Sequence, residues 1–102
     1  KATLGASPGR VVTGYADRVL LDSLAIEANG NIAQATLVAH PGICSIHPTT
    51  GAQEWFDFPD LLTTNIVFGG ADMMDAWVCL STTGKLAKCR WPRPGLRLAF
   101  YA

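Results

Sequence analysis

Short apolar stretches, separated by Gly, Pro and Asn residues, dominate the sequence from one end to the other. They are rich in Val, Ile, Phe, Trp and Thr, which favour β-strands. No segment keeps a 3.6-residue period, so we expect at most one helical turn, over residues 71–75. The pattern predicts strands over residues 10–14, 24–28, 32–37, 42–47, 53–58, 65–69, 76–80, 84–90 and 96–101.

The connections between these strands are short and have the composition of turns. Asn29-Gly30 predicts a hairpin turn, because both residues tolerate positive φ. Thr49-Thr50-Gly51 and Thr82-Thr83-Gly84 predict two further turns. The chain is therefore expected to be all-β and antiparallel.

The predicted strands repeat along the chain. Residues 24–26 match residues 66–68 at an offset of 42, and residues 42–44 match residues 84–86 at the same offset. The strand over 32–36 matches 76–80 when two extra residues are allowed in the second turn. A four-strand repeat of about 40–45 residues is typical of a β-propeller blade.

The repeat divides the chain, residues 1–102, into two blades of one propeller segment. Residues 10–60 form the first blade, with 10–14 as the outer strand of a preceding one, and residues 61–102 form the second. Two blades alone leave apolar faces in water, and propellers close with about four to eight blades. The missing blades would come from a longer chain or from further copies, three copies giving six blades; a two-sheet sandwich is the structural alternative.

The composition and charge of the chain argue against some classes of binding partner. Apolar residues make up 49% and charged residues 16% of the chain, and the net charge is zero. No basic stripe suits nucleic acid, and no apolar stretch approaches the roughly 20 residues that span a membrane. The sequence opens on Lys1, and its first residues do not have the pattern of a signal peptide. We therefore expect that it begins within a longer protein or that its start has been trimmed.

The three cysteines, Cys44, Cys79 and Cys89, fit no close-pair spacing, and each lies within an apolar run. We interpret them as buried free thiols in strands rather than as zinc or disulfide residues. Free thiols indicate a reducing compartment, so the expected location is the cytoplasm.

Three stretches, "LDSLAIEANGNIAQATL", "LLTTNIVFGG" and "LSTTGKLAKCRWPRPGL", resemble the C-terminal third of the gluconolactonase, regucalcin and luciferin-regenerating-enzyme-like family. The likeness covers residues 10 to 101, and its specificity comes from the combination of TTN-x-x-FGG, LS-x-TG-x-L and WPRPGL. The resemblance implies a six-bladed propeller with a divalent metal at the mouth of its channel, and hydrolysis of sugar-acid lactones or related esters. This chain would correspond to blades five and six.

The resemblance gives Asp22 a role as metal ligand and as general base for the attacking water. The repeat places Asp22 just ahead of the first strand of its blade, where Thr64 stands in the second. Oxygen ligands suit Ca²⁺ or Mg²⁺, Zn²⁺ being a third possibility, and the metal would polarise the lactone carbonyl. The alternative is an acid that only caps a strand or turn.

The chain also departs from the family. Ala33 and Gln34 stand where aromatic or β-branched residues are usual, and the other metal ligands of the family lie in blades that this chain does not contain. One carboxylate cannot hold Ca²⁺, which takes about six to eight oxygens. We therefore expect weak or absent metal binding, and no activity, from the isolated chain.

Other polar residues have weaker claims. Asn65, beside Thr64, and His40, in a loop before Pro41, are candidates for substrate binding. The remaining polar and aromatic residues have simpler interpretations as loop, solvated or packing residues: His47, Asp72, Asp75, Arg90, Arg93, Trp55, Trp77 and Trp91.

Two functions follow from these patterns. One is a metal-dependent lactonase or esterase to which this chain contributes Asp22. The other is a non-catalytic two-blade module that assembles with itself or with a partner. The distance of Asp22 from an acid of another blade or copy distinguishes the two.

Overall fold

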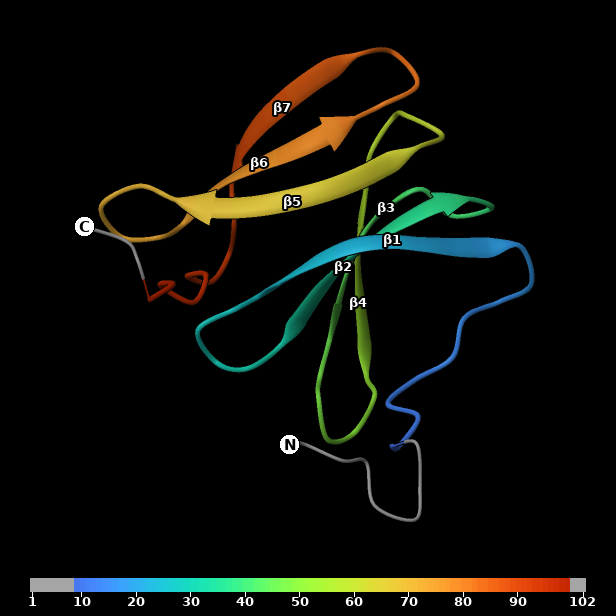
Figure 1. The fold of residues 1–102 in the computed structure, drawn as a ribbon, viewed down its shortest axis with the longest axis horizontal. Helices are drawn as coiled ribbons and strands as arrows, with labels where there is room; N and C mark the ends of the chain where they lie inside the picture. Colours follow the sequence, from blue (N-terminus) through green and yellow to red (C-terminus); the bar gives the residue numbers. More distant parts are fainter. Residues whose placement is uncertain (1–8, 100–102) are drawn as a thin grey trace, which may run out of the picture.

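A computed structural model describes residues 9–99 of the chain, which form two antiparallel sheets and no helix within that range (Figure 1). The first sheet has the strand order β1-β2-β3-β4 and the second the order β5-β6-β7. The strands are β1 (Val19–Ile26), β2 (Ile32–Val38), β3 (Gly42–Ile46), β4 (Gln53–Asp57), β5 (Thr63–Gly69), β6 (Asp75–Leu80) and β7 (Lys85–Arg90). The all-β antiparallel prediction is confirmed.

Hairpin turns connect the strands within each sheet, and a turn follows β1 where one was predicted, although only Gly30 and not Asn29 has positive φ. Gly30 has a φ of 94°, and the Asn29 side chain accepts a hydrogen bond from the Asn31 backbone N–H at 2.9 Å. The turn pairs Ile26 with Ile32, which fixes the register of the hairpin as far as the Leu24–Gln34 pair. Local sequence thus determines how the first sheet begins.

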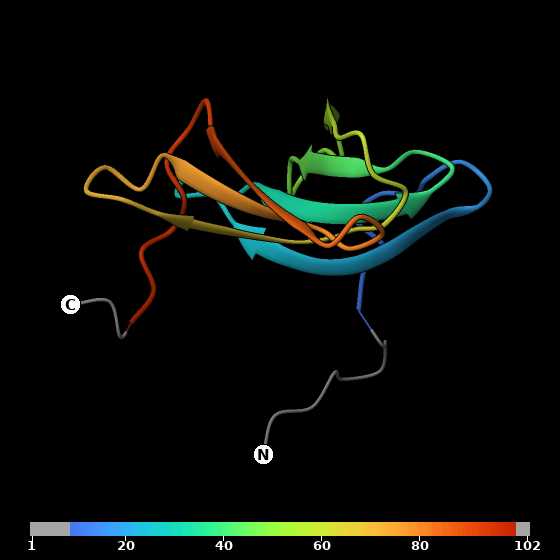
Figure 2. The ribbon, with the colours of Figure 1, turned by 90° about the horizontal axis from the view of Figure 1, so that it is seen from above.

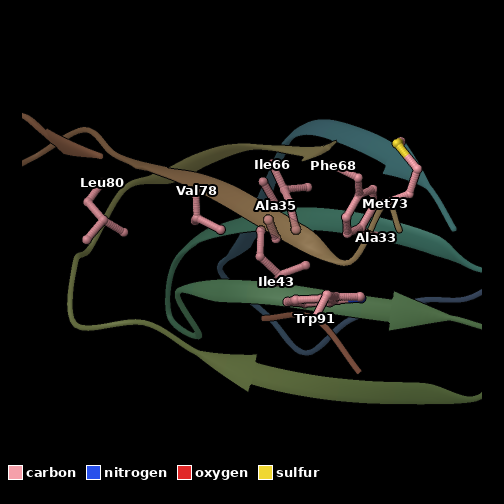
Figure 3. Packing of buried hydrophobic residues seen from close by; sticks show 10 residues of the cluster. Ala33, Ala35, Ile43, Ile66, Phe68, Met73, Val78, Leu80 and Trp91 are labelled. Carbon is pink, nitrogen blue, oxygen red and sulfur yellow. The ribbon is translucent and has the colours of Figure 1, made fainter. Parts of the chain in front are cut away.

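The two sheets pack face to face around one apolar cluster (Figure 3). Small residues of β2, Ala33 and Ala35, leave room for larger side chains of the second sheet such as Phe68. Ile43 of β3 and Trp91, just after β7, complete the centre of the cluster, and both are at most 2% exposed. The other buried members are Ile66, Met73, Ala76, Val78 and Leu80.

The first strands of the two sheets, β1 and β5, run side by side in the same direction (Figure 1). Figure 2 shows that both lie along one side of the molecule, with β3 and β4 on the other side. β1 and β5 are each the edge of their own sheet and are not paired with each other. The strands predicted over 24–28 and 65–69 therefore meet in space.

Strand pairing supports the repeat seen in the sequence. Leu24 pairs with Gln34, and Ile66 pairs with Val78. The first strands are thus offset by 42 residues and the second strands by 44, as the two extra turn residues require.

The third strands depart from the predicted offset. Gln34 pairs with Cys44, whereas Val78 pairs with Ala87, so the offset is 43 rather than 42. Because alternate residues of a strand face opposite sides, a shift of one residue exchanges the two faces. The sequence match of Gly42 to Gly84 was therefore wrong by one position, and Gly42 corresponds to Lys85.

Two predicted strands are wrong, and the second sheet consequently has three strands rather than four. Residues 10–14 belong to no sheet; instead Arg10 and Thr13 donate hydrogen bonds to backbone carbonyls of the β3–β4 turn. Residues 96–99 also form no strand, and 100–101 of that prediction lie outside the described residues. The helical turn expected over 71–75 is a non-helical turn that leads into β6.

The segment after β7 leaves its own sheet and crosses to the first one. Gly95 forms an isolated bridge with Glu27, and the Leu96 N–H donates to the Ile26 carbonyl at 2.9 Å. Residues that the repeat assigns to a fourth strand therefore bind the end of β1 instead. The backbone of this segment joins the two sheets.

Candidate functional site

A β-bulge interrupts the first strand of each sheet at the same place in the repeat. In β1 the register with β2 shifts between Leu21 and Leu24, and in β5 the register with β6 shifts between Thr63 and Asn65. Asp22 lies in the first bulge and Thr64 in the second. A bulge leaves residues outside the ladder and redirects their side chains, and bulges are frequent beside functional sites.

Asp22 was predicted to stand ahead of its strand, and this placement is wrong. β1 begins at Val19, three residues before Asp22, so Asp22 lies inside the strand, at its bulge. The sequence did not reveal the earlier start of the strand, because Leu20 and Leu21 precede Asp22 in an unbroken apolar run. Thr64 is likewise inside β5, where its hydroxyl lies 2.5 Å from the Ser81 hydroxyl.

The Gln34 side chain supports the bulge from the neighbouring strand. Its Nε2 lies 2.8 Å from the Asp22 carbonyl, 3.2 Å from the Ser23 carbonyl and 3.1 Å from that of Ala35. Gln34 is only 7% exposed, and these contacts satisfy the amide that a buried strand position would otherwise leave without a partner. The unusual Gln of β2 therefore orients the backbone that carries Asp22.

The Asp22 carboxylate itself is exposed and weakly held. Its Oδ1 is 3.4 Å from the Ser23 hydroxyl, which donates to it. The backbone carbonyls of Asp22 and Ser23 each accept a hydrogen bond from Gln34. Within the described part of the chain, no three His, Cys, Asp or Glu side chains are grouped closely enough to hold a metal ion. These residues by themselves do not fit a complete divalent-metal site.

Asn65 lines a pocket of about 360 Å³ between β1 and β5. Its Oδ1 accepts a hydrogen bond from the Ile66 backbone N–H at 2.9 Å, which directs the amide nitrogen away from the backbone. The other lining residues are apolar: Leu24, Ala25, Ile26, Ile66, Val67, Phe68, Leu96 and Leu98. Asn65 therefore contributes the polar side chain of a mainly apolar pocket.

His40 lies in the β2–β3 turn and is part of a different surface cluster. Its Nε2 is 2.8 Å from Asp57 Oδ1, and its ring stacks on Trp55 with centroids 3.6 Å apart. His40 does not line the pocket, and no hydrogen bond or ion pair joins any two of Asp22, Asn65 and His40 among residues 9–99. His40 is thus separate from the pocket that Asn65 lines, and the three predicted site residues have no direct polar contact with one another in the described part of the chain.

The remaining candidates have structural partners. Asp72 and Asp75 both bind Arg90, at 2.6 Å and 2.8 Å, so neither is simply solvated, and the Arg90 hydrogen bonds lower the pKa of Asp72 to about 2. Trp91 is buried as predicted, whereas Trp55 and Trp77 are half-buried on the outer sheet surfaces rather than in the core.

The free thiols of Cys44, Cys79 and Cys89 lie in β3, β6 and β7, but only the first is fully buried. Burial raises the pKa of the Cys44 and Cys89 thiols, so neither is an activated nucleophile. His47 is exposed, and its Nδ1 accepts the Thr49 and Thr50 backbone N–H groups of the next turn.

Sequence reasoning missed a buried carboxylate, Glu27. Its side chain is fully buried and accepts hydrogen bonds from Ser45, Trp91 and Arg93. Burial alone would raise the pKa of Glu27, but the bonds from Arg93, Ser45 and Trp91 outweigh it, so the pKa lies below its ordinary value. Glu27 shares a face with Ala25 in the strand alternation, and this inward position was the available signal.

Asp60, in the β4–β5 connection, is a second missed carboxylate. It is 5% exposed and accepts hydrogen bonds from the backbone N–H groups of Leu62, Thr82 and Thr83 and from the Thr83 hydroxyl. Burial opposes the charge, but the hydrogen bonds from Thr83 and the backbone hold the pKa of Asp60 well below its usual range. Asp60 fastens the β6–β7 turn to the start of β5.

Comparisons with known proteins add no relative: the sequence matches no model of a protein family and none of the curated proteins. No helix within residues 9–99 has the length and apolar character needed to cross a bilayer. What the chain does is therefore inferred from its geometry together with the sequence patterns described above.

Proposed function

We propose that this chain forms two neighbouring blades of a β-propeller of the gluconolactonase type, and that Asp22 supplies one carboxylate to a divalent-metal site for lactone or ester hydrolysis. The observation that carries the proposal is the bulge at equivalent places of β1 and β5, with Asp22 in one and Thr64 in the other. A site around a propeller axis requires that the first strands of neighbouring blades present side chains at the same height along the axis. The two bulges would place Asp22 and Thr64 in this way.

The faces of the two sheets support continued stacking. In the first sheet, the residues that face the second sheet lie in β2 and β3, and their equivalents in the second sheet lie on its far face. The three pairs of equivalent positions are Ala33 and Trp77, Ala35 and Cys79, and Ile43 and Leu86. Trp77 and Cys79 are half-buried and Leu86 is exposed, so a further sheet could pack on this face as the second sheet packs on the first.

The metal site needs ligands from beyond this pair of sheets. Asp22 is the carboxylate that this chain would offer, and the blades that complete the propeller would supply the rest, either from a longer chain or from further copies. A bound divalent metal would polarise the carbonyl of the ester or lactone and ease deprotonation of water. The part assigned to this chain is the placement of the Asp22 carboxylate by the bulge and by Gln34.

Calorimetric titration with Ca²⁺, Mg²⁺ and Zn²⁺ tests the proposal on fractions separated by size. Asp22→Asn is compared with Asp17→Asn, which changes an exposed aspartate outside the strands. Metal binding and lactone hydrolysis are expected only from the assembled form. Asp22→Asn should abolish both, whereas Asp17→Asn should change neither. Tight one-to-one binding by a monomer, or an assembled form unaffected by Asp22→Asn, contradicts the proposed role.

A second candidate is a scaffold that assembles without catalysing a reaction. It is favoured by large apolar residues of β1 and β5 that are about half exposed: Leu20 at 53%, Leu21 at 51%, Leu24 at 50% and Val67 at 48%. Light scattering that finds a cyclic oligomer with no metal binding supports this candidate. A stable monomer at tens of micromolar rules out self-assembly as its function.

We place the protein in the cytoplasm. Three free thiols are compatible with a reducing compartment, where disulfides rarely form. Localisation of the tagged full-length product in cell fractions tests this assignment.

A further inference from the structure

The pocket between β1 and β5 has the dimensions of a small-molecule site. Its volume is about 360 Å³, within the range of about 300–1,000 Å³ found for ligand pockets. Two walls come from parallel neighbouring strands, and the third comes from Leu96 and Leu98 of the C-terminal segment. Hydrogen bonding of Leu96 to Ile26 fixes that third wall in place.

The pocket has one polar end. Asn65 stands next to the β5 bulge, at the level of the repeat where β1 carries Asp22 and Ser23. The Asn65 Oδ1 already accepts one hydrogen bond, from the Ile66 N–H, whereas the Asn65 amide nitrogen makes no hydrogen bond within residues 9–99 and is free to donate to a ligand. An amide nitrogen donates, so it selects a ligand with an acceptor oxygen.

The rest of the pocket is apolar and accessible. Leu24, Val67 and Leu96 are 50%, 48% and 45% exposed, so a bound ligand would remove apolar surface of each residue from water. Burial of such surface contributes about 25 cal/mol per Å². A polyhydroxylated ligand would leave its hydroxyl groups without partners against these walls, at a cost for each group.

We propose that this pocket binds a small, mainly apolar ester or lactone, with its carbonyl oxygen on the Asn65 amide and its alkyl chain along Leu24, Val67 and Leu96. The ligand class rests on the proposed hydrolytic function, and it replaces the sugar-acid lactone suggested by the sequence with an alkyl-substituted one. The pocket begins two residues beyond Asp22 along β1, so the reactive end of the ligand lies toward the bulges.

The test is a titration of the isotope-labelled protein, followed by NMR, with γ-decalactone and with D-glucono-1,5-lactone as probes. We expect γ-decalactone to shift amide signals of β1, β5 and residues 96–98 in a saturable one-to-one manner, and the sugar lactone to leave them unchanged. Asn65→Asp keeps the Oδ1 acceptor but removes the amide donor. We expect it to raise the dissociation constant for γ-decalactone about fivefold to tenfold, which is the effect of losing one hydrogen bond. Val67→Trp fills the pocket and abolishes the saturable shifts.

Two matched variants control for general effects. Asn29→Asp alters an exposed turn asparagine whose Oδ1 also accepts a backbone N–H, and Leu86→Trp enlarges an exposed strand residue outside the pocket. Neither should change the affinity. The proposal is overturned by shifts that do not saturate, by equal or tighter binding of the sugar lactone, or by pocket signals that respond to protein concentration instead of to the lactone, which would identify a second copy as the occupant.

The outcome separates this proposal from the hydrolytic one. Asp22→Asn removes metal binding but leaves γ-decalactone binding intact if both proposals hold. Asp22-dependent hydrolysis without saturable γ-decalactone binding refutes the pocket alone. Binding of γ-decalactone without any Asp22-dependent metal binding leaves the pocket standing and refutes the metal site.

Discussion

Arg93 Nε lies 2.5 Å from Oε1 of Glu27, a carboxylate that is fully buried between the two sheets. The guanidinium also reaches Glu54 at 2.7 Å, on the exposed side. Ser45 and Trp91 donate to the other oxygen of Glu27, at 2.6 Å and 3.1 Å. One buried charge therefore joins the end of β1, strand β3 and the segment after β7.

Glu27→Gln should destabilise the protein by about 3 kcal/mol or more, because it leaves Arg93 without its buried counter-charge. Glu54→Gln, which removes the exposed partner of the same guanidinium, should cost about 1 kcal/mol or less. Urea unfolding followed by tryptophan fluorescence gives both values. Equal costs for the two variants would show that the buried pair has no special role.

Gly95→Ala should also destabilise the fold. A Cβ at Gly95 would overlap the Phe68 side chain, which lies in the core and cannot move without disturbing Trp91. Overpacking of this kind costs about 1–3 kcal/mol. Gly14→Ala, where an added Cβ meets no atom within 4 Å, is the matched control and should leave the unfolding midpoint nearly unchanged.

Stability should fall in acid, and Asp60 should be one of the causes. Its pKa is lower in the folded than in the unfolded state, so the stabilisation is complete above the ordinary carboxyl value of 3.8 and is lost as the pH falls below it. Asp60→Asn should lower the melting temperature at neutral pH and flatten its decline in acid. Circular dichroism melts from pH 7 downward measure both effects, and Asp17→Asn should reproduce the wild-type decline.

Tyr15→Phe should be neutral or stabilising. The Tyr15 hydroxyl is buried without a hydrogen-bond partner among the described residues, and such a group costs about 1–3 kcal/mol. Burial, with Cys44 beside it, raises the pKa of Tyr15 above its ordinary value of 10, so ionisation of the hydroxyl disfavours the folded state and the protein loses stability as the pH rises above that value.

Urea unfolding at neutral pH and above pH 10 checks both parts of the Tyr15 prediction. The phenylalanine variant should lose less stability in alkali than the wild type. A loss of more than about 1 kcal/mol at neutral pH would mean that the hydroxyl has a partner.

The sequence anticipated more of the fold than of the site. Alternation and turn composition located seven strands, because these are local properties of the chain. A bulge is not a local property of the chain, because it arises from the pairing of two strands. Asp22 and Thr64 leave the hydrogen-bonded ladder only because of the way β1 pairs with β2 and β5 pairs with β6. The partner of Gln34, the backbone of the neighbouring strand, could not be read from spacing for the same reason.

By itself, the sequence determined an antiparallel all-β chain with a turn at Asn29-Gly30, since strand alternation and turn chemistry are local properties of the chain. Only the tertiary structure decided that residues 10–14 and 96–99 stay out of the sheets, that Glu27 is buried with Arg93, and that Asn65 opens into an apolar pocket. Each of these depends on contacts between residues far apart in sequence. The intrinsic preference of a segment for the strand conformation is worth only about 1 kcal/mol. Contacts between distant residues, such as the buried pair of Glu27 and Arg93, can be worth more and therefore prevail over it.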